Sequence, residues 1–239
     1  MLPSISLKLL AEINKFRNIV EREAEAPYVV ESCRPSAQWP PNGKIEFRDF
    51  SMKYGADLGY TLRNINFTIN PGEKIGIVGR TGAGKSSLAK VLFRLIHENT
   101  SGSILIDGQD ISEFGVGDYR PRLGMIPQES SMFSGFSSGQ QQLFGLCRVI
   151  MRKRKIVVLD EATANVDLET DKSVQELIRK EFGDYTVLTI AHRLETIMNS
   201  DRIIIMDKGT IAEIGAPQEL LAKDGMFAQL AKTSDFGQY

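Results

Sequence analysis

The octapeptide GRTGAGKS, residues 79–86, constrains the fold more than any other stretch of the 239-residue chain. It matches the pattern G-x-x-x-x-G-K-[ST], follows the short apolar run KIGIV, and opens the helical pattern KSSLAKVLF. Glycines in such a loop let backbone N–H groups wrap an anion, and the N-terminus of the following helix favours negative charge. The strand–loop–helix context therefore predicts a phosphate-binding loop rather than a plain glycine-rich turn.

The last two residues of the loop suit a nucleotide triphosphate. Lys85 is placed to neutralise β- and γ-phosphate charge, and the hydroxyl of Ser86 is a suitable Mg²⁺ ligand.

Segments with strand and helix patterns alternate along the chain. Their β-then-α order predicts an α/β fold, a mostly parallel sheet flanked by helices, with an antiparallel β part at the start. A hairpin is expected to turn at Lys208–Gly209. The expected strands are 44–52, 62–69, 74–79, 102–108, 156–161, 185–192 and 202–215, and the expected helices are 85–96, 167–182, 217–223 and 225–232.

The first 42 residues differ from the rest of the chain. Residues 5–20 carry apolar side chains at helical spacing, which predicts an amphipathic helix that either docks on protein or touches a membrane surface. A stretch rich in proline follows and is typical of an extended linker. We therefore divide the chain into residues 1–42, a helix and linker, and residues 43–239, a compact domain.

Charge and composition exclude several classes of partner. The net charge is −1 and 42% of residues are hydrophobic, so no global field favours nucleic acid or anionic lipid. No apolar run approaches the ~18 residues that a membrane span requires, so any membrane role must come through a partner. Two cysteines, Cys33 and Cys147, form no recognisable disulfide or metal pattern, which favours a reducing, cytoplasmic setting.

Two acidic residues and a histidine end apolar strand patterns. Asp160 and Glu161 close IVVLDE, at the ligand-binding edge of a parallel sheet. Asp160 is expected in the Mg²⁺ shell and Glu161 to orient or deprotonate an attacking water, although the pair could instead cap the next helix. His192 has either a structural role or a γ-phosphate or catalytic-water contact.

Other candidates have structural interpretations. His97 is expected to end the helix that follows the phosphate loop, without a function. Cys147 is expected in the core because it shares a helical spacing with Leu143, Leu146 and Ile150. The basic run MRKRK, residues 151–155, indicates a solvated helix end rather than a nucleic-acid patch.

Taken together, these motifs resemble the ATP-binding cassette (ABC) family from about Gly43 to the end of the chain. GRTGAGKSS is similar to its Walker A motif and IVVLDE to its Walker B motif. The segments RPSAQWPPNGKIEFRDFSMKY and LDEATANVD further resemble the second cassette of the multidrug-resistance-associated exporters, subfamily C.

The resemblance implies roles for further residues. Gln128 looks like the Q-loop glutamine, a catalytic and Mg²⁺-contacting residue, and Asp167 the D-loop aspartate. His192 resembles the switch histidine, and Tyr54 the aromatic residue that stacks on adenine. The ATP-binding residues implied are Tyr54, Gly79, Arg80, Thr81, Gly82, Ala83, Gly84, Lys85, Ser86 and Ser87, and the signature residues that would face the ATP of a second cassette are Ser137, Ser138, Gly139 and Gln140.

One departure from the family is large. A helical subdomain of several dozen residues separates the Q-loop from the signature in this family, but here Gln128 and Ser137 are only nine positions apart. Most of the helical subdomain is therefore expected to be missing. Phe136 and Ser138 are smaller departures from the LSGGQ signature.

The resemblance implies ATP and Mg²⁺ as ligands, and a second cassette paired head to tail and transmembrane domains as partners. It places the chain at the cytoplasmic face of a membrane, or free in the cytoplasm if made alone. Three functions stay open: an ATPase that drives an exporter, a truncated module that binds ATP without turnover, and a soluble cassette protein of DNA repair or translation.

Overall fold

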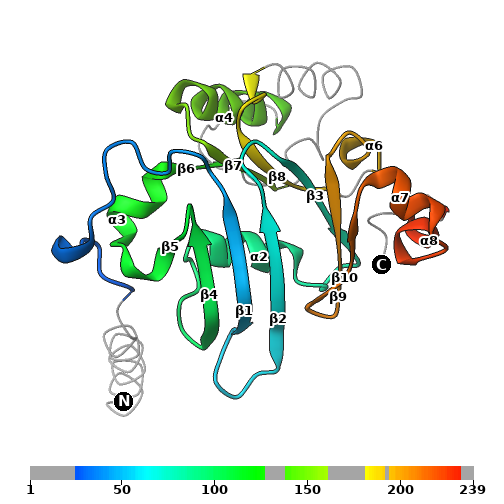
Figure 1. Ribbon diagram of the computed structural model, residues 1–239, viewed down its shortest axis with the longest axis horizontal. Helices are drawn as coiled ribbons and strands as arrows, with labels where there is room; N and C mark the ends of the chain where they lie inside the picture. Colours follow the sequence, from blue (N-terminus) through cyan, green and yellow to red (C-terminus); the bar gives the residue numbers. More distant parts are fainter. Residues whose placement is uncertain (1–24, 127–137, 161–180, 192–193, 233–239) are drawn as a thin grey trace, which may run out of the picture.

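The computed structural model describes residues 25–126, 138–160, 181–191 and 194–232, and these form two sheets with helices between and around them (Figure 1). One sheet has four antiparallel strands and the other has six mostly parallel strands. This arrangement confirms the predicted α/β class with an antiparallel part at the start.

The antiparallel sheet has the strand order β2-β1-β4-β5. Its strands are β1 (Ile45–Lys53), β2 (Tyr60–Ile69), β4 (Thr100–Ile106) and β5 (Gln109–Asp110). Along β1, Ile45 and Phe47 are buried, whereas Arg48, which faces outward, is exposed. A sheet with one face on the core and one face in water produces this pattern.

The six-stranded sheet has the order β10-β9-β3-β8-β7-β6. Its strands are β3 (Lys74–Gly79), β6 (Leu123–Ile126), β7 (Ile156–Asp160), β8 (Thr186–Ile190), β9 (Arg202–Asp207) and β10 (Thr210–Gly215). All neighbours are parallel except β9 and β10, which form the expected hairpin. Its turn residues Lys208 and Gly209 have φ of 45° and 80°, the positive values that a type I′ turn requires.

The parallel strands are buried on both faces. In β9, Ile204 packs into the cluster between the two sheets, whereas Ile203 and Ile205 pack into a second cluster on the other face. In β7, Val158 and Val157 divide in the same way. Side chains alternate across a strand, so helices must cover both faces.

Three groups of helices provide this cover (Figure 1). Helix α2 (Lys85–Leu92) lies in the cluster between the sheets, and α4 (Ser138–Arg152) packs on β6. Helices α6 (Leu194–Ile197), α7 (Pro217–Ala222) and α8 (Met226–Lys232) cover the side near β3 and β10. The short elements are η1 (Glu31–Cys33), η2 (Ile111–Glu113), α3 (Val116–Tyr119) and η3 (Arg120–Arg122).

Helix α2 ends four residues earlier than the pattern predicts. Arg94 has φ of 51°, and its N–H and that of Leu95 donate to the carbonyls of Val91 and Lys90. These bonds form a Schellman motif, which terminates a helix. His97 therefore lies beyond the helix, and the prediction that it ends α2 is wrong.

The prediction that Cys147 is a core residue is also wrong. Helix α4 buries Leu146 and Val149, and Cys147 is exposed. Val149 shifts the centre of the buried stripe away from Cys147, which lies about 100° around the helix from Leu146. The exposed face also carries Phe144 and Met151, which are 52% and 83% exposed.

Residues 25–42, the lead-in segment, pack along the domain. The carbonyls of Pro27 and Tyr28 accept bonds from the N–H groups of Val116 and Gly117, at 3.0 and 2.8 Å. Trp39 is 5% exposed and lies against Phe114, with ring centroids 4.9 Å apart. Within the described residues, no helix is both long and apolar enough to cross a bilayer.

Candidate functional site

The phosphate loop connects β3 to α2, as the motif predicts. Gly79 is the last residue of β3, and Gly84 is the N-cap of α2. The Lys85 side chain is 6% exposed, and its Nζ donates to the carbonyl oxygens of Gly79 at 2.8 Å and Arg80 at 3.2 Å. The ammonium group is thereby held against the loop, at the helix end that favours anions.

Glycine is required at two loop positions for different contacts. Gly79 has φ of 152°, and a Cβ there would lie 2.2 Å from the carbonyl oxygen of Met206. Gly84 has φ of 103°, and a Cβ there would lie 2.9 Å from Leu62. Gly82 also has positive φ, 79°, but a Cβ there would meet nothing within 4 Å.

The β9–β10 hairpin tip braces the loop. Gly209 donates its N–H to the carbonyl of Ala83 at 3.1 Å and accepts from the N–H of Arg63 at 2.8 Å. A Cβ on Gly209 would lie 2.3 Å from the carbonyl oxygen of Thr61. The loop is therefore held between the antiparallel sheet and the hairpin, and the sequence motif alone does not indicate either support.

A pocket of about 320 Å³ opens over the loop. Tyr54, directly after β1, forms one side, and its hydroxyl lies 3.0 Å from the Oγ of Ser87. Thr61 also lines the pocket, although no motif pointed to it. The lining residues are Tyr54, Thr61, Thr81, Gly82, Gly84, Lys85, Ser86 and Ser87. The structure thus brings Tyr54 to the predicted phosphate loop, 25 or more positions along the chain.

Asp160 lies at the same edge of the parallel sheet as the phosphate loop. It is the last residue of β7 and pairs with Ile190 at the end of β8, which in turn pairs with Ile77 of β3. The register places the carboxyl ends of all three strands at one level, with Val78 and Gly79 continuing into the loop. Ligands bind at this edge in open parallel sheets.

Several predicted site residues lie outside the described residues: Gln128, Ser137, Glu161, Asp167 and His192. Ser138, Gly139 and Gln140 form the start of α4. The roles given to these residues stay predictions.

The described residues fit Mg-ATP. The pocket volume is within the range of about 300–1,000 Å³ for small-molecule sites. Lys85 and the N-terminus of α2 supply positive charge, while Ser86 and Asp160 supply oxygen ligands of the kind that Mg²⁺ prefers. The half-exposed ring of Tyr54 offers an apolar surface beside the phosphate loop.

Known proteins resemble this chain in sequence. A family model described as "ABC transporter" matches residues 62–137. The vacuolar heme ABC transmembrane exporter abc3 of Schizosaccharomyces pombe is 43% identical over 93% of this chain and 18% of its own length. ATP-binding cassette sub-family C member 2 of Rattus norvegicus is 41% identical over 93% of this chain and 17% of its own length. The chain thus spans less than a fifth of the length of these curated relatives.

The alignments are several dozen positions longer than the part of this chain that they cover. The match to the S. pombe exporter extends over 270 alignment positions. It covers 93% of the 239 residues of this chain, which is about 222 residues. The difference, about 48 positions, has no counterpart in this chain. The metal resistance protein YCF1 of Saccharomyces cerevisiae, 41% identical over 89% of this chain and 17% of its own length, gives a similar difference over 261 positions. Between Ile126 of β6 and Ser138 of α4 only residues 127–137 are available for a helical subdomain. The reduced subdomain agrees with this difference in length.

A solved structure extends the likeness to the fold. A bacterial Atm1-family ABC exporter with ATP bound matches 94% of this chain and 47% of its own, with a TM-score of 0.82 and 26% identity. The chain is an ATP-binding cassette domain of the ABC transporter family, it has a reduced helical subdomain, and it resembles the cassettes of subfamily C.

Proposed function

We propose that this cassette binds Mg-ATP over the phosphate loop and hydrolyses it, paired head to tail with a second cassette, to drive export through transmembrane domains. The observation that carries the proposal is the pocket in which Tyr54, Lys85 and Ser86 converge at the N-terminus of α2. In this proposal the domain lies at the cytoplasmic face of a membrane, held there by its partners.

In this proposal each predicted site residue has a role in binding or hydrolysing Mg-ATP. Lys85 and the loop N–H groups hold the phosphate chain, and Ser86 and Asp160 hold the metal ion, with Gln128 as a further candidate ligand. Glu161 and His192 are the candidates for orienting the attacking water. Bound Mg²⁺ would neutralise charge that develops on the phosphate oxygens.

The signature residues would face the nucleotide of the second cassette, and Asp167 would lie near the same interface. The signature residues are Ser137, Ser138, Gly139 and Gln140.

A second function is favoured by the short connection before α4. Only residues 127–137 join β6 to the signature helix, in place of a subdomain that also supports docking of transmembrane domains in the family. A chain with this connection would bind Mg-ATP but neither pair nor turn over. In this alternative the domain is a module that binds nucleotide but is not coupled to transport.

The two functions are separated by measuring Mg-ATP affinity and ATPase rate over a range of protein concentrations. Binding with a specific rate that rises with concentration and is abolished by Glu161→Gln supports hydrolysis in a paired state. Binding without turnover supports the module.

Lys85→Ala tests the binding site itself. Loss of a charge-assisted bond of about 1.5–3 kcal/mol should weaken Mg-ATP binding about 10- to 150-fold. Lys223→Ala, which removes an exposed lysine on a different part of the surface, is the matched control. Equal affinities in the two variants would contradict the assignment.

A further inference from the structure

The C-terminal end of the phosphate-loop helix is held by side chains from residues 119–120. The last carbonyls of a helix have no partner within it and need one outside. Tyr119 donates its hydroxyl to the carbonyl of Leu92. Arg120 donates from Nε to the carbonyl of Phe93 at 3.0 Å and from Nη2 to that of Arg94 at 2.8 Å.

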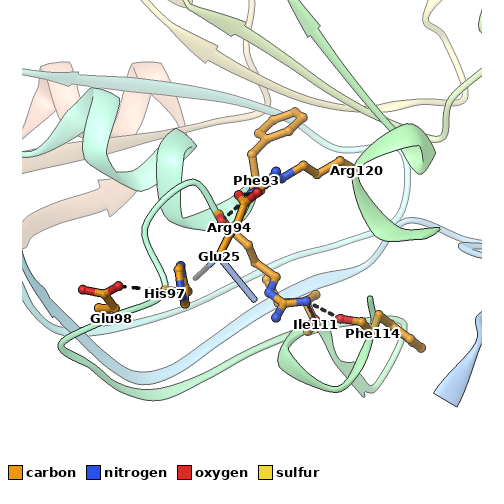
Figure 2. Close-up of polar contacts among 8 residues, drawn as sticks. All are labelled: Glu25, Phe93, Arg94, His97, Glu98, Ile111, Phe114 and Arg120. Atoms are coloured by element: carbon orange, nitrogen blue, oxygen red, sulfur yellow. Dashed lines mark hydrogen bonds and ion pairs between the residues drawn. The ribbon is translucent and has the colours of Figure 1, made fainter. Parts of the chain in front are cut away.

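Arg94 fixes the same helix end from inside. It is 8% exposed and adopts the positive φ of the Schellman motif. Its Nη1 donates to the carbonyls of Ile111 and Phe114, as Figure 2 shows. Burial lowers the pKa of this guanidinium, and Arg120 nearby acts in the same direction. The end of α2 is therefore attached at several points to the segment 111–120.

Arg120 also contacts the lead-in segment. Its Nη2 donates to the Glu25 carboxylate in an ion pair, seen beside Phe93 and Arg94 in Figure 2. The hydrogen bond from Arg120 lowers the pKa of Glu25 below its usual range. One guanidinium group thus joins a residue at the start of the described chain to the last carbonyls of α2.

Other contacts hold the lead-in segment without touching α2. Arg34 forms a two-pronged bond with Asp118, at 3.0 and 3.1 Å, and Arg122 donates to the carbonyl of Ala37. The ion pair from Glu25 to Arg120 leads through one side chain from the lead-in segment to the helix end. The apolar counterpart is the ring contact between Trp39 and Tyr119, whose centroids lie 6.0 Å apart.

Helix α2 is short enough to transmit a shift from one end to the other. It has eight residues, about 12 Å of helix, and it begins at Lys85 of the phosphate loop. Leu88 and Leu92 are fully buried between the sheets, so the helix moves as a unit in a close-packed core. A displacement of the Phe93–Arg94 end of α2 therefore also displaces the phosphate loop.

We propose that Arg120 is a positioning residue for the nucleotide site, and that it senses through Glu25 whether the lead-in segment is docked. Docking of Glu25 fixes the Arg120 guanidinium on the carbonyls of Phe93 and Arg94, which holds α2 and its loop in the ATP-binding position. Release of the lead-in segment loosens this hold and lowers affinity. The inference rests on the proposed Mg-ATP site.

The test compares Mg-ATP affinity in the whole chain and in four variants. Arg120→Ala is expected to weaken binding about fivefold, the lower end of typical coupling between sites. Glu25→Gln is expected to weaken it less, and Arg120→Lys to recover part of the loss. Arg48→Ala is the matched control, because it removes an exposed arginine that pairs with Glu46 on β1; its affinity should match that of the unaltered chain.

A second measurement uses the reciprocity of coupling. If docking favours ATP, then Mg-ATP must favour docking by the same factor. Tyr28 is 75% exposed, so chymotrypsin cleavage after it reports on the lead-in segment. Mg-ATP should slow this cleavage in the unaltered chain and in Arg48→Ala, but not in Arg120→Ala.

The outcomes separate this inference from the proposed function. No Mg-ATP binding by the unaltered chain overturns the proposed function and the inference with it. Binding that Arg120→Ala and Glu25→Gln leave unchanged overturns the inference alone. If Arg120→Ala does not fold, Arg120→Lys and Glu25→Gln decide: unchanged affinity and unchanged cleavage protection in both overturn the inference, and a loss in both supports it.

Discussion

The hydroxyl oxygens of Tyr54 and Ser87 lie 3.0 Å apart, which joins the end of β1 to the first turn of α2. The Nζ of Lys90 lies 5.9 Å from the centre of the same ring. The tyrosine ring, 50% exposed, is therefore oriented by its hydroxyl while its surface stays available beside the phosphate loop. This geometry is suited to stacking on a base.

Two substitutions at Tyr54 should separate stacking from this hydrogen bond. Stacking of an aromatic side chain on a base contributes about 1–3 kcal/mol, so Tyr54→Ala should weaken Mg-ATP binding at least about fivefold. Tyr54→Phe keeps the ring and should retain most of the affinity. Titration with a fluorescent ATP analogue measures both, and equal losses in the two variants would argue against stacking.

Alanine substitutions at Gly79 and Gly82 should have unequal effects on folding stability. At Gly82 an alanine has free space and costs only the strain of positive φ, about 1–2 kcal/mol. At Gly79 the added Cβ would lie 2.2 Å from a backbone oxygen, so the free energy of unfolding should fall by more than about 3 kcal/mol. Urea denaturation of both variants checks the order, which similar losses would contradict.

The ion pair between Glu73 and Arg202 should make stability depend on acid pH. Burial of the Glu73 carboxyl raises its pKa, but hydrogen bonds from Arg202 and from the N–H of Asn70 outweigh burial, so the pKa lies below its ordinary value. A lowered folded-state pKa means that the stabilisation is complete above the unfolded-state pKa of about 4.3. It is lost as pH falls through the folded-state pKa.

Glu73→Gln provides the comparison for this pH dependence. The difference in free energy of unfolding between the unaltered chain and Glu73→Gln should be constant from about pH 6 to 8 and should shrink below about pH 4. Thermal or urea unfolding across this range measures it. A difference that grows on acidification would show that the sign assigned to the Glu73 pKa is wrong.

The two cysteines should differ in their reaction with thiol reagents. Cys147 is exposed on α4, whereas Cys33 is only partly exposed and lies 3.9 Å from a carboxylate oxygen of Glu113. Access to the sulfur favours labelling of Cys147 over Cys33. Mass spectrometry after brief alkylation should therefore find Cys147 modified first; faster labelling of Cys33 would contradict the exposed position of Cys147.

The local features of this cassette could be predicted from sequence because they depend on neighbouring residues. The phosphate loop needs glycines where φ is positive, and GRTGAGKS has them. It also needs a strand before it and a helix after it, and the runs KIGIV and KSSLAKVLF provide these. The turn at Lys208–Gly209 and the alternating burial of β1 follow from the same short-range rules. The reduced helical subdomain before α4 was also predictable, because it follows from the nine-position separation of Gln128 and Ser137.

Other features depended on which surfaces meet. The spacing of Leu143, Leu146, Cys147 and Ile150 is compatible with burial of Cys147, but packing of α4 on β6 selects the side marked by Val149. Helix α2 has apolar residues beyond Leu92, yet Arg94 ends it because its guanidinium finds the carbonyls of Ile111 and Phe114.

The sequence by itself determined that a nucleotide loop exists, since backbone conformation and local charge suffice for it. Only the tertiary structure decided what surrounds that loop: Tyr54 and Thr61 at the pocket, Gly209 on its flank, and Glu25 joined through Arg120 to the far end of α2. These contacts join residues far apart in the chain. They depend on how two sheets and a helix fill a common core, which no short stretch of sequence encodes.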